Sequence, residues 1–252
     1  MAANRADIGL SRLGAVIACE SCIVLVMNRS EDLIKEVARE VTNLFEAKSG
    51  SQEIAQEDAL SQIGRIFYEI QPSSVLDLGS GIGTVSYYLS LLATDVNFEL
   101  YLYEINEYCQ EALMENLKGL NFYLIRGVEE LSQLSKPIEF VIIDDFISFE
   151  ATRKLLSNCQ PKAVFIEGHR RMQRMFVFKS FRSLNVKFKF KSFHPTPISH
   201  KVGCVFYVGT EKSNHTFALF SIKFSLLYSR IKSIQARLPL LRNLSVRRLI
   251  GK

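Results

Sequence analysis

An apolar run that leads directly into three alternating glycines is the part of this chain best suited to chemistry. Residues 75–84 read VLDLGSGIGT. Glycines at this spacing let the backbone turn sharply and lie close to a ligand. Thr84 stands where the dinucleotide fingerprint GxGxxG requires its last glycine, and Asp77 would repel a pyrophosphate. The segment therefore indicates a ligand without phosphates that carries a cationic amino group.

This segment resembles the first motif of the class I S-adenosylmethionine-dependent methyltransferases. In that family an acid precedes three glycines at alternate positions, and here Asp77 precedes Gly79, Gly81 and Gly83, with Ser80 after the first glycine. The resemblance implies that these residues bind S-adenosylmethionine. It covers roughly residues 52–208.

A second acidic residue follows the next apolar run. Glu104 ends the sequence YLYE and lies 21 residues beyond Gly83. In the family this acid binds both ribose hydroxyls, and a carboxylate that accepts two O–H groups suits a cis-diol. The resemblance places Glu104 and its neighbour Ile105 in the cofactor site. The alternative is that Glu104 is only the polar end of a strand.

The next two strand ends extend the resemblance. Gly127 and Val128 look like the adenine-binding turn of small-molecule O-methyltransferases, although the acid that many relatives place directly after the glycine is delayed to Glu129. Asp144 and Asp145 end the sequence FVIIDD, which is similar to the motif that faces the methyl group. The Asn/Asp-Pro-Pro-Tyr box of amino-methylating enzymes is missing. We therefore predict an oxygen, or another simple nucleophile, as the acceptor.

Candidate proton acceptors gather at the ends of the same strands, where ligands bind in open α/β sheets. We predict Asp144, Asp145 and His169 as catalytic residues, with Glu167 as a further candidate base. His169 has the side chain best suited to accept a proton near neutral pH, but it is equally well explained as an exposed residue at a helix start. A divalent metal is possible but not favoured, because the amide of metal-dependent catechol-type relatives is missing.

Basic residues dominate the second half of the chain. The net charge is +5, yet residues 1–150 carry 10 basic and 24 acidic side chains, and residues 151–252 carry 21 and 2. This asymmetry indicates an anionic partner, or two halves that neutralise each other. Arg170, Arg171 and Arg174 are candidates to hold an anionic acceptor, or they form a solvated helix face. Aminopropyltransferases share the first motif, but their amine substrates need an acidic pocket, so we disfavour them.

The elements that must position these residues follow from periodicity. After Pro72, short apolar runs alternate with amphipathic segments, as in a parallel sheet with crossover helices. We expect strands at 74–78, 98–103, 122–125, 140–144 and 163–167, helices at 85–93, 107–118, 149–158 and 170–184, and a turn at 128–134. Runs 186–191 and 202–208 have no helix between them and predict an antiparallel hairpin. Lysines alternate with Phe188 and Phe190, which favours a guarded edge strand over a nucleic-acid surface.

The predicted fold is α/β, a Rossmann-like doubly wound sheet of seven strands, mostly parallel with the last antiparallel. Residues 1–71 are predicted to form an N-terminal extension and helical cap, with helices starting at Ser30 and at Gln52. The methyltransferase domain spans 72–210. Residues 211–252 form a basic tail whose apolar stripe predicts either an amphipathic segment on an anionic membrane or a helix packed on the domain.

The expected setting is cytoplasmic. The chain is 48% hydrophobic and 23% charged, which excludes disordered and fibrous classes. Five scattered cysteines, including the pair Cys19 and Cys22, fit a reduced compartment. The apolar run 13–27 is too short to span a membrane comfortably, and a start at Met27 stays open. The alternative to a methyltransferase is a non-catalytic module of the same fold that docks on a membrane or partner through its tail.

Overall fold

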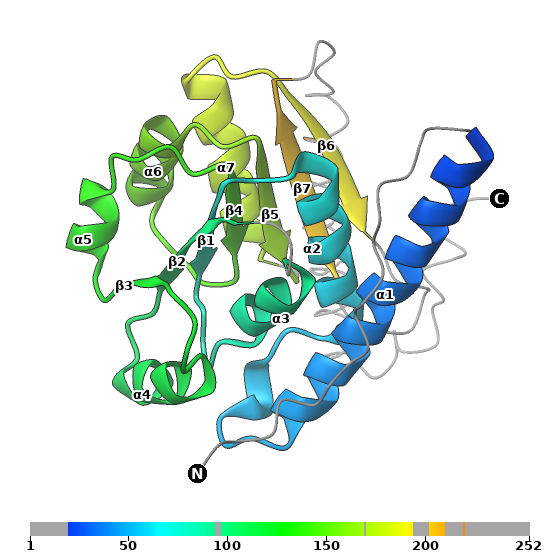
Figure 1. The fold of residues 1–252 in the computed structure, drawn as a ribbon. Coiled ribbons are helices and arrows are strands. Elements are labelled where there is room, and N and C mark those ends of the chain that lie inside the picture. The colour runs from blue at the N-terminus through cyan, green and yellow to red at the C-terminus, as the bar shows by residue number, and fades with distance from the viewer. Residues whose placement is uncertain (1–19, 94–96, 169, 194–201, 210–218, 220–252) are drawn as a thin grey trace, which may run out of the picture.

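A seven-stranded sheet forms the centre of the computed structural model, which describes residues 20–93, 97–168, 170–193, 202–209 and 219 (Figure 1). The strand order is β3-β2-β1-β4-β5-β7-β6. β7 is antiparallel to both of its neighbours, and the other six strands run in one direction. The strands are β1 (Ser74–Leu78), β2 (Glu99–Tyr103), β3 (Tyr123–Ile125), β4 (Phe140–Ile143), β5 (Ala163–Glu167), β6 (Phe188–Phe193) and β7 (Gly203–Val208).

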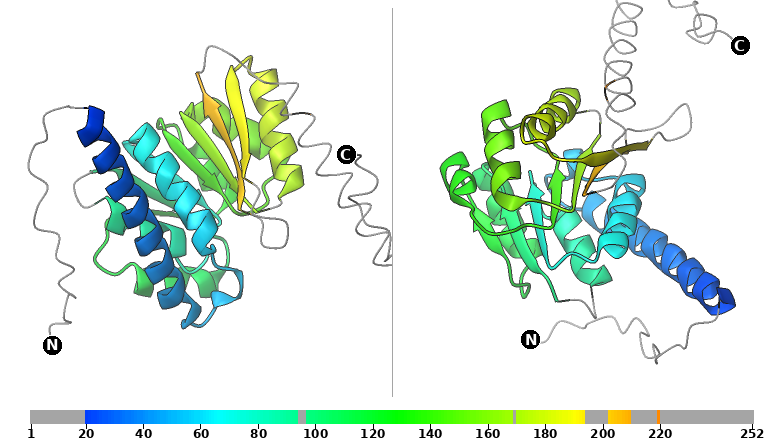
Figure 2. Two further views of the ribbon diagram at one scale, coloured as in Figure 1. Left: turned by 90° about the vertical axis from the view of Figure 1, so that its right-hand side faces the viewer. Right: turned by 90° about the horizontal axis from the view of Figure 1, so that it is seen from above.

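Helices cover both faces of the sheet, as Figure 2 shows. One face carries α1 (Glu20–Glu46), α2 (Glu57–Ile70), α3 (Thr84–Leu92) and α4 (Glu107–Asn116). The other face carries α5 (Val128–Gln133), α6 (Phe149–Cys159) and α7 (Arg171–Ser183). Successive strand residues alternate between the two cores, since Val75 packs with the first set and Leu76 with the second. The doubly wound, mixed sheet predicted from the sequence is confirmed.

The five parallel strands that the sequence predicted lie within one residue of the expected bounds, and the predicted terminal hairpin is also confirmed. Its first strand lies two residues later than expected. β6 is the edge of the sheet, with Phe188 and Phe190 buried and Lys189 and Lys191 exposed. The expected turn at 128–134 is wrong, because Val128–Gln133 contains no glycine or proline and forms the short helix α5.

The N-terminal cap also differs from expectation. α1 begins at Glu20 rather than at Ser30, since no glycine or proline interrupts residues 20–46 and the polar group at 30–32 lies within the helix. The second cap helix begins at Glu57 rather than at Gln52. Gly50, in the left-handed region at φ 86°, separates α1 from a single 3-10 turn, Ser51–Glu53.

Parts of the chain that carried predictions lie outside the described residues: His169, Cys19, the hairpin connection 194–201 and the basic tail apart from Leu219. Cys109, Cys159 and Cys204 have free thiols. Among the described residues, no helix is both long and apolar enough to cross a membrane.

Candidate active site

The glycine loop between β1 and α3 is held by close packing and by hydrogen bonds to β2. All three glycines have positive φ angles, 88° at Gly79, 54° at Gly81 and 94° at Gly83. The N–H groups of Gly79 and Ser80 donate to the carbonyl of Tyr103 at 2.9 and 3.1 Å. A Cβ on Gly79 would lie 2.8 Å from the backbone nitrogen of Asp145, whereas a Cβ on Gly81 would meet open space. The loop therefore leaves room for a ligand at Gly81.

Glu104 lies directly beside this open position. It follows β2 and is mostly buried. Its Oε2 accepts a hydrogen bond from the N–H of Gly81 at 2.8 Å, and its Oε1 accepts one from the N–H of Asn106 at 2.8 Å. Both carboxylate oxygens are thus fixed at the edge of the loop, where their remaining lone pairs can accept O–H groups.

Asp77 lies on β1 behind the loop and is completely buried. Its Oδ2 accepts a hydrogen bond from the Ser86 hydroxyl at 2.7 Å, and its Oδ1 has no partner among the described residues. Burial raises the pKa of Asp77 to about 7, although the Ser86 hydrogen bond lowers it, and the carboxylates of Asp144 and Glu104 raise it further. A cation nearby would stabilise its charged form.

The ends of β4 and β5 bring together two more acids and one arginine. Asp144 accepts a hydrogen bond from the Nε of Arg170 at 2.6 Å. Glu167 ends β5 with 9% of its surface exposed, and its Oε2 has no partner in the part of the chain that the structure describes. Burial, with the charges of Asp144 and Asp77, raises the pKa of Glu167 well above its usual range, while Arg170 opposes this shift.

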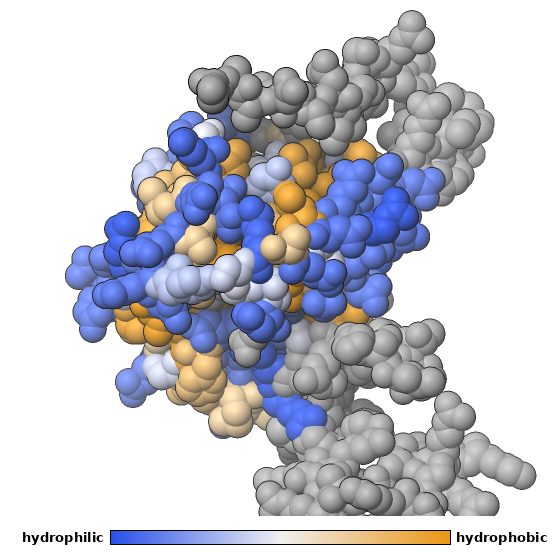
Figure 3. All heavy atoms as spheres, turned by 90° about the horizontal axis from the view of Figure 1, so that it is seen from below, coloured by the Kyte–Doolittle hydropathy of each residue, from blue (hydrophilic) through white to orange (hydrophobic). Residues whose placement is uncertain are grey.

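These groups surround a cavity of about 350 Å³ at the carboxyl ends of the central strands. Seven of the predicted catalytic and cofactor-binding residues line it: Gly79, Ser80, Gly81, Glu104, Ile105, Asp144 and Asp145. The further candidates Glu167 and Arg170 line it as well. Asp77 and Gly83 support the loop without lining the cavity, and Gly127 and Val128 lie beyond its wall, at the end of β3. Figure 3, seen from below Figure 1, shows a mostly hydrophilic face with smaller hydrophobic areas.

The cap forms a part of the wall that the sequence analysis did not predict. Gly50, Ile54 and Ala55, from the segment between α1 and α2, also line the cavity, and Gly50 lies close to Ile82 of the glycine loop. The pairing of Arg170 with Asp144 was also missed. The sequence did contain one signal that the cap helices lie near the site. Side chains alternate along a strand, so Asp77 is on the same face of the sheet as Val75, and that face packs against α1–α3.

The charge of the cavity corrects one expectation. Its wall carries four carboxylates, and Arg170 is its only cation among the described residues. Arg174 is 3% exposed and donates to the carbonyl of Gly168, so it supports the backbone rather than meeting an acceptor. The basic composition of residues 151–252 therefore does not describe the pocket, and it gives no reason to disfavour amine substrates.

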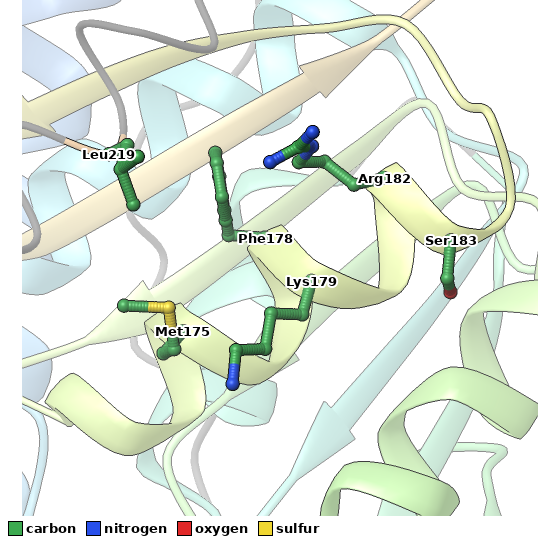
Figure 4. A pocket seen from close by; sticks show the side chains of 6 residues that line it. All are labelled: Met175, Phe178, Lys179, Arg182, Ser183 and Leu219. Atoms are coloured by element: carbon green, nitrogen blue, oxygen red, sulfur yellow. The ribbon is translucent and has the colours of Figure 1, made fainter.

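A second cavity, of about 570 Å³, lies against α7 on the opposite face of the sheet. Figure 4 shows Lys179 and Arg182 projecting from α7 beside Met175, Phe178 and Leu219. The residues that the structure describes in this wall include no carboxylate and no glycine loop. We therefore assign the chemistry to the first cavity. In the described part of the chain, no cluster of three or more histidine, cysteine or acidic side chains is arranged to hold a metal ion.

Solved structures share this architecture. An SAH-bound methyltransferase from Podospora anserina, PaMTH1, aligns with a TM-score of 0.53 over 79% of this chain and 100% of its own, at 12% identity. The fold is that of class I methyltransferases. A Klebsiella pneumoniae protein that carries a provisional O-methyltransferase assignment aligns with a TM-score of 0.50 over 70% of this chain and 90% of its own, at 13% identity. No protein-family model matches the chain, and no curated protein is significantly similar in sequence.

Within the class I methyltransferase fold, the observed donor set suits a sulfonium nucleoside. Glu104 provides fixed acceptors for a diol, and Gly81 leaves open space beside them. Asp77 and Glu167 each have a buried oxygen with no hydrogen-bond partner among the described residues, and a cationic ligand would favour the ionised form of both carboxyl groups. These are the properties that a cationic ligand with a ribose requires.

Proposed function

We propose that this protein is an S-adenosylmethionine-dependent methyltransferase that acts on an oxygen of a small acceptor, and that it works in the cytoplasm. The observation that carries the proposal is the Glu104 carboxylate, held by two backbone N–H groups directly beside Gly81. The shared fold supports the reaction class, and the acidic wall supports a positively charged donor. An anionic acceptor would depend on Arg170, whose guanidinium already pairs with Asp144.

The residues of this chain have separable roles in such a reaction. S-adenosylmethionine supplies an electrophilic methyl group on a sulfonium. Glu104 would bind the ribose hydroxyls, with Ile105 beside the nucleoside, and Asp77 would favour the positive charge from behind the loop. Gly127 and Val128 are proposed to contact the adenine. Alignment of donor and acceptor supplies most of the rate enhancement in a displacement of this kind.

Removal of the acceptor proton belongs to the other wall of the cavity. Asp144 and Asp145 are proposed as proton acceptors, together with His169, and Glu167 joins them because its Oε2 is buried without a partner. A carboxyl group with a raised pKa accepts a proton more readily near neutral pH than an ordinary one. A reaction without a metal stays our prediction, because the amide that metal-dependent relatives provide is missing from this sequence.

The test is methyl transfer. Purified full-length protein would be incubated with S-adenosylmethionine labelled in its methyl group and with fractionated small-molecule extracts, and labelled products would be separated. We expect label in a hydroxylated compound, and none with Glu104→Ala. Absence of label from every fraction, by a folded protein that also fails to bind S-adenosylhomocysteine, would favour the non-catalytic module that docks through residues 211–252 on a membrane or partner.

A second candidate activity follows from the acidic wall. Aminopropyl transfer also uses a sulfonium nucleoside, but its acceptor is an amine, which the four wall carboxylates would attract. The two activities differ in the donor, because aminopropyl transfer requires the decarboxylated form. Tighter binding of decarboxylated S-adenosylmethionine than of S-adenosylmethionine would support this second activity and overturn methyl transfer.

A further inference from the structure

Three carboxyl groups lie on one face of the sheet at the carboxyl ends of adjacent strands. Asp77 is on β1, Asp144 follows β4 and Glu167 ends β5. The alternation of side chains places all three on the face covered by α1–α3, where Phe140 and Phe165 form the core beneath them. Ile143 and Ile166 are register partners, so the residues that follow them, Asp144 and Glu167, are neighbours across the β4–β5 pair.

Few groups compensate the negative charge of this cluster. The Oδ1 of Asp77 and the Oε2 of Glu167 are buried without a hydrogen-bond partner among the described residues. Arg170 pairs with Asp144, and that ion pair is partly exposed, so water screens much of its effect. A buried carboxyl group without a partner is costly when charged, which favours its protonated form.

Among the described residues, the other elements around Glu167 supply no further cation that faces it. On β7, the Cys204 thiol stays neutral because burial raises its pKa to about 11. On α7, Arg174 is directed to the Gly168 carbonyl. α3 contributes the hydroxyl of Ser86, the cap contributes apolar side chains, and β2 leads to Glu104, whose oxygens accept backbone N–H groups. In the described part of the chain, Arg170 is therefore the one cation beside the cluster, and a cationic ligand could supply further positive charge.

We propose that the cluster of Asp77, Asp144 and Glu167 distinguishes a charged donor from its neutral product, because Glu167 releases a proton when a sulfonium binds and keeps it when a thioether binds. This inference rests on the proposed function. S-adenosylmethionine and S-adenosylhomocysteine share the nucleoside, the carboxylate and the amino group. They differ by one methyl group and one positive charge, and a nearby positive charge favours the ionised carboxyl group.

The same exchange balances charge during the reaction. The acceptor oxygen forms a bond to the methyl carbon, and the carbon–sulfur bond breaks with its electron pair remaining on sulfur. The hydroxyl proton of the acceptor passes to the ionised Glu167. The sulfonium charge and the carboxylate charge thus disappear together, so the buried cluster returns to its ligand-free charge when the product forms.

Calorimetric titration tests this without an acceptor. Wild-type protein at pH 7 would be titrated with S-adenosylmethionine and with S-adenosylhomocysteine, each in two buffers with different heats of ionisation, which gives the number of protons released. We expect more proton release with S-adenosylmethionine. Sinefungin, which carries a protonated amine in place of the methylsulfonium, should behave like the donor. The excess should shrink as the pH is raised, because a growing fraction of the ligand-free protein has already lost this proton.

Two variants test whether Glu167 is the group that releases the proton when S-adenosylmethionine binds. Glu167→Gln should abolish the difference in proton release and lower the preference for S-adenosylmethionine over S-adenosylhomocysteine by about tenfold, because it removes the charge that attracts the sulfonium. Its affinity for S-adenosylhomocysteine should change less than about threefold, because the amide resembles the protonated acid and leaves the neutral complex nearly unchanged. Glu111→Gln, on the exposed side of α4 and outside this cavity, should keep the difference.

The outcomes separate the two claims. Equal proton release by both ligands in the wild-type protein would overturn the inference and leave the proposed function intact, since both ligands bind. A difference that persists in Glu167→Gln would overturn the assignment to Glu167. Failure of folded wild-type protein to bind either ligand would overturn the proposed function itself. The wild-type comparison decides the main point even if Glu167→Gln does not fold.

Discussion

The carboxyl groups on the two walls of the cavity differ in their hydrogen bonding. On the β1–β2 wall, both oxygens of Glu104 accept backbone N–H groups at 2.8 Å. On the β4–β5 wall, Glu167 is buried with an oxygen that has no partner among the described residues. The first wall is organised before a ligand arrives, whereas on the second wall Arg170 pairs with Asp144 and no described group pairs with the Oε2 of Glu167. We interpret the first as the nucleoside side and the second as the side where charge and protons change.

The largest expected effect comes from the glycine loop of the first wall. Gly79→Ala should lower the free energy of unfolding by about 4 kcal/mol, because its Cβ would meet the backbone of Asp145 and its φ is positive. Gly81→Ala is the matched control. It bears the strain of a positive φ, about 1 to 2 kcal/mol, but its Cβ enters open space, so it should fold and lose ligand binding.

Chemical denaturation and calorimetric binding would measure both variants. Equal stability of Gly79→Ala and Gly81→Ala would show that the loop is not held by close packing against the end of β4.

The next largest effect concerns Asp77 and the pH dependence of the free energy of unfolding. Its pKa is 3.8 when unperturbed and about 7 in the folded, ligand-free protein. The folded state therefore binds the proton more tightly, and this contribution to stability is complete below pH 4 and is lost as the pH rises through 7. Asp77→Asn should remove part of this decline, so that the variant is more stable than wild type at pH 8 by a few kcal/mol.

Denaturant unfolding of the ligand-free protein at pH 5 and pH 8 measures that slope. An unchanged slope in Asp77→Asn would mean that Asp77 is charged and compensated in the folded protein, contrary to its burial.

Glu104 tests the organised wall directly. Glu104→Ala should weaken S-adenosylhomocysteine binding about 100-fold. It removes the two charge-assisted hydrogen bonds from the ribose hydroxyls to the carboxylate, at about 1.5 kcal/mol each. Glu104→Gln keeps the shape and one acceptor oxygen, and it should lose less. Equilibrium binding of both variants, with thermal unfolding to confirm that they fold, would measure this. Equal losses of affinity in Glu104→Ala and Glu104→Gln would contradict the prediction that the shape and acceptor oxygen kept by Gln preserve part of the binding.

Arg170 should give the smallest effect. Its ion pair with Asp144 is partly exposed, and such pairs contribute at most about 1 kcal/mol. Arg170→Gln should therefore change thermal stability little and leave S-adenosylhomocysteine affinity nearly unchanged. It removes the one cation among the described residues that opposes protonation of Glu167. A large loss of S-adenosylhomocysteine affinity would show instead that Arg170 contributes to binding the nucleoside.

The same division explains what the sequence could predict. The glycine loop and Glu104 are local signals at strand ends, and the strands that position them are continuous apolar runs, so both were found. The start of α1 was missed because ten further residues continue the helix without a breaker. The pairing of Arg170 with Asp144, and the cap residues Ile54 and Ala55 in the wall, depend on tertiary packing that no local pattern encodes.

The central claim is that the cavity at the strand ends binds a sulfonium nucleoside through Glu104 and the glycine loop. Calorimetric titration of the purified full-length protein with S-adenosylhomocysteine tests this most directly. The account predicts saturable, micromolar binding with one ligand per chain, and loss of that binding in Glu104→Ala. Absence of binding by a wild-type protein shown to be folded would contradict it.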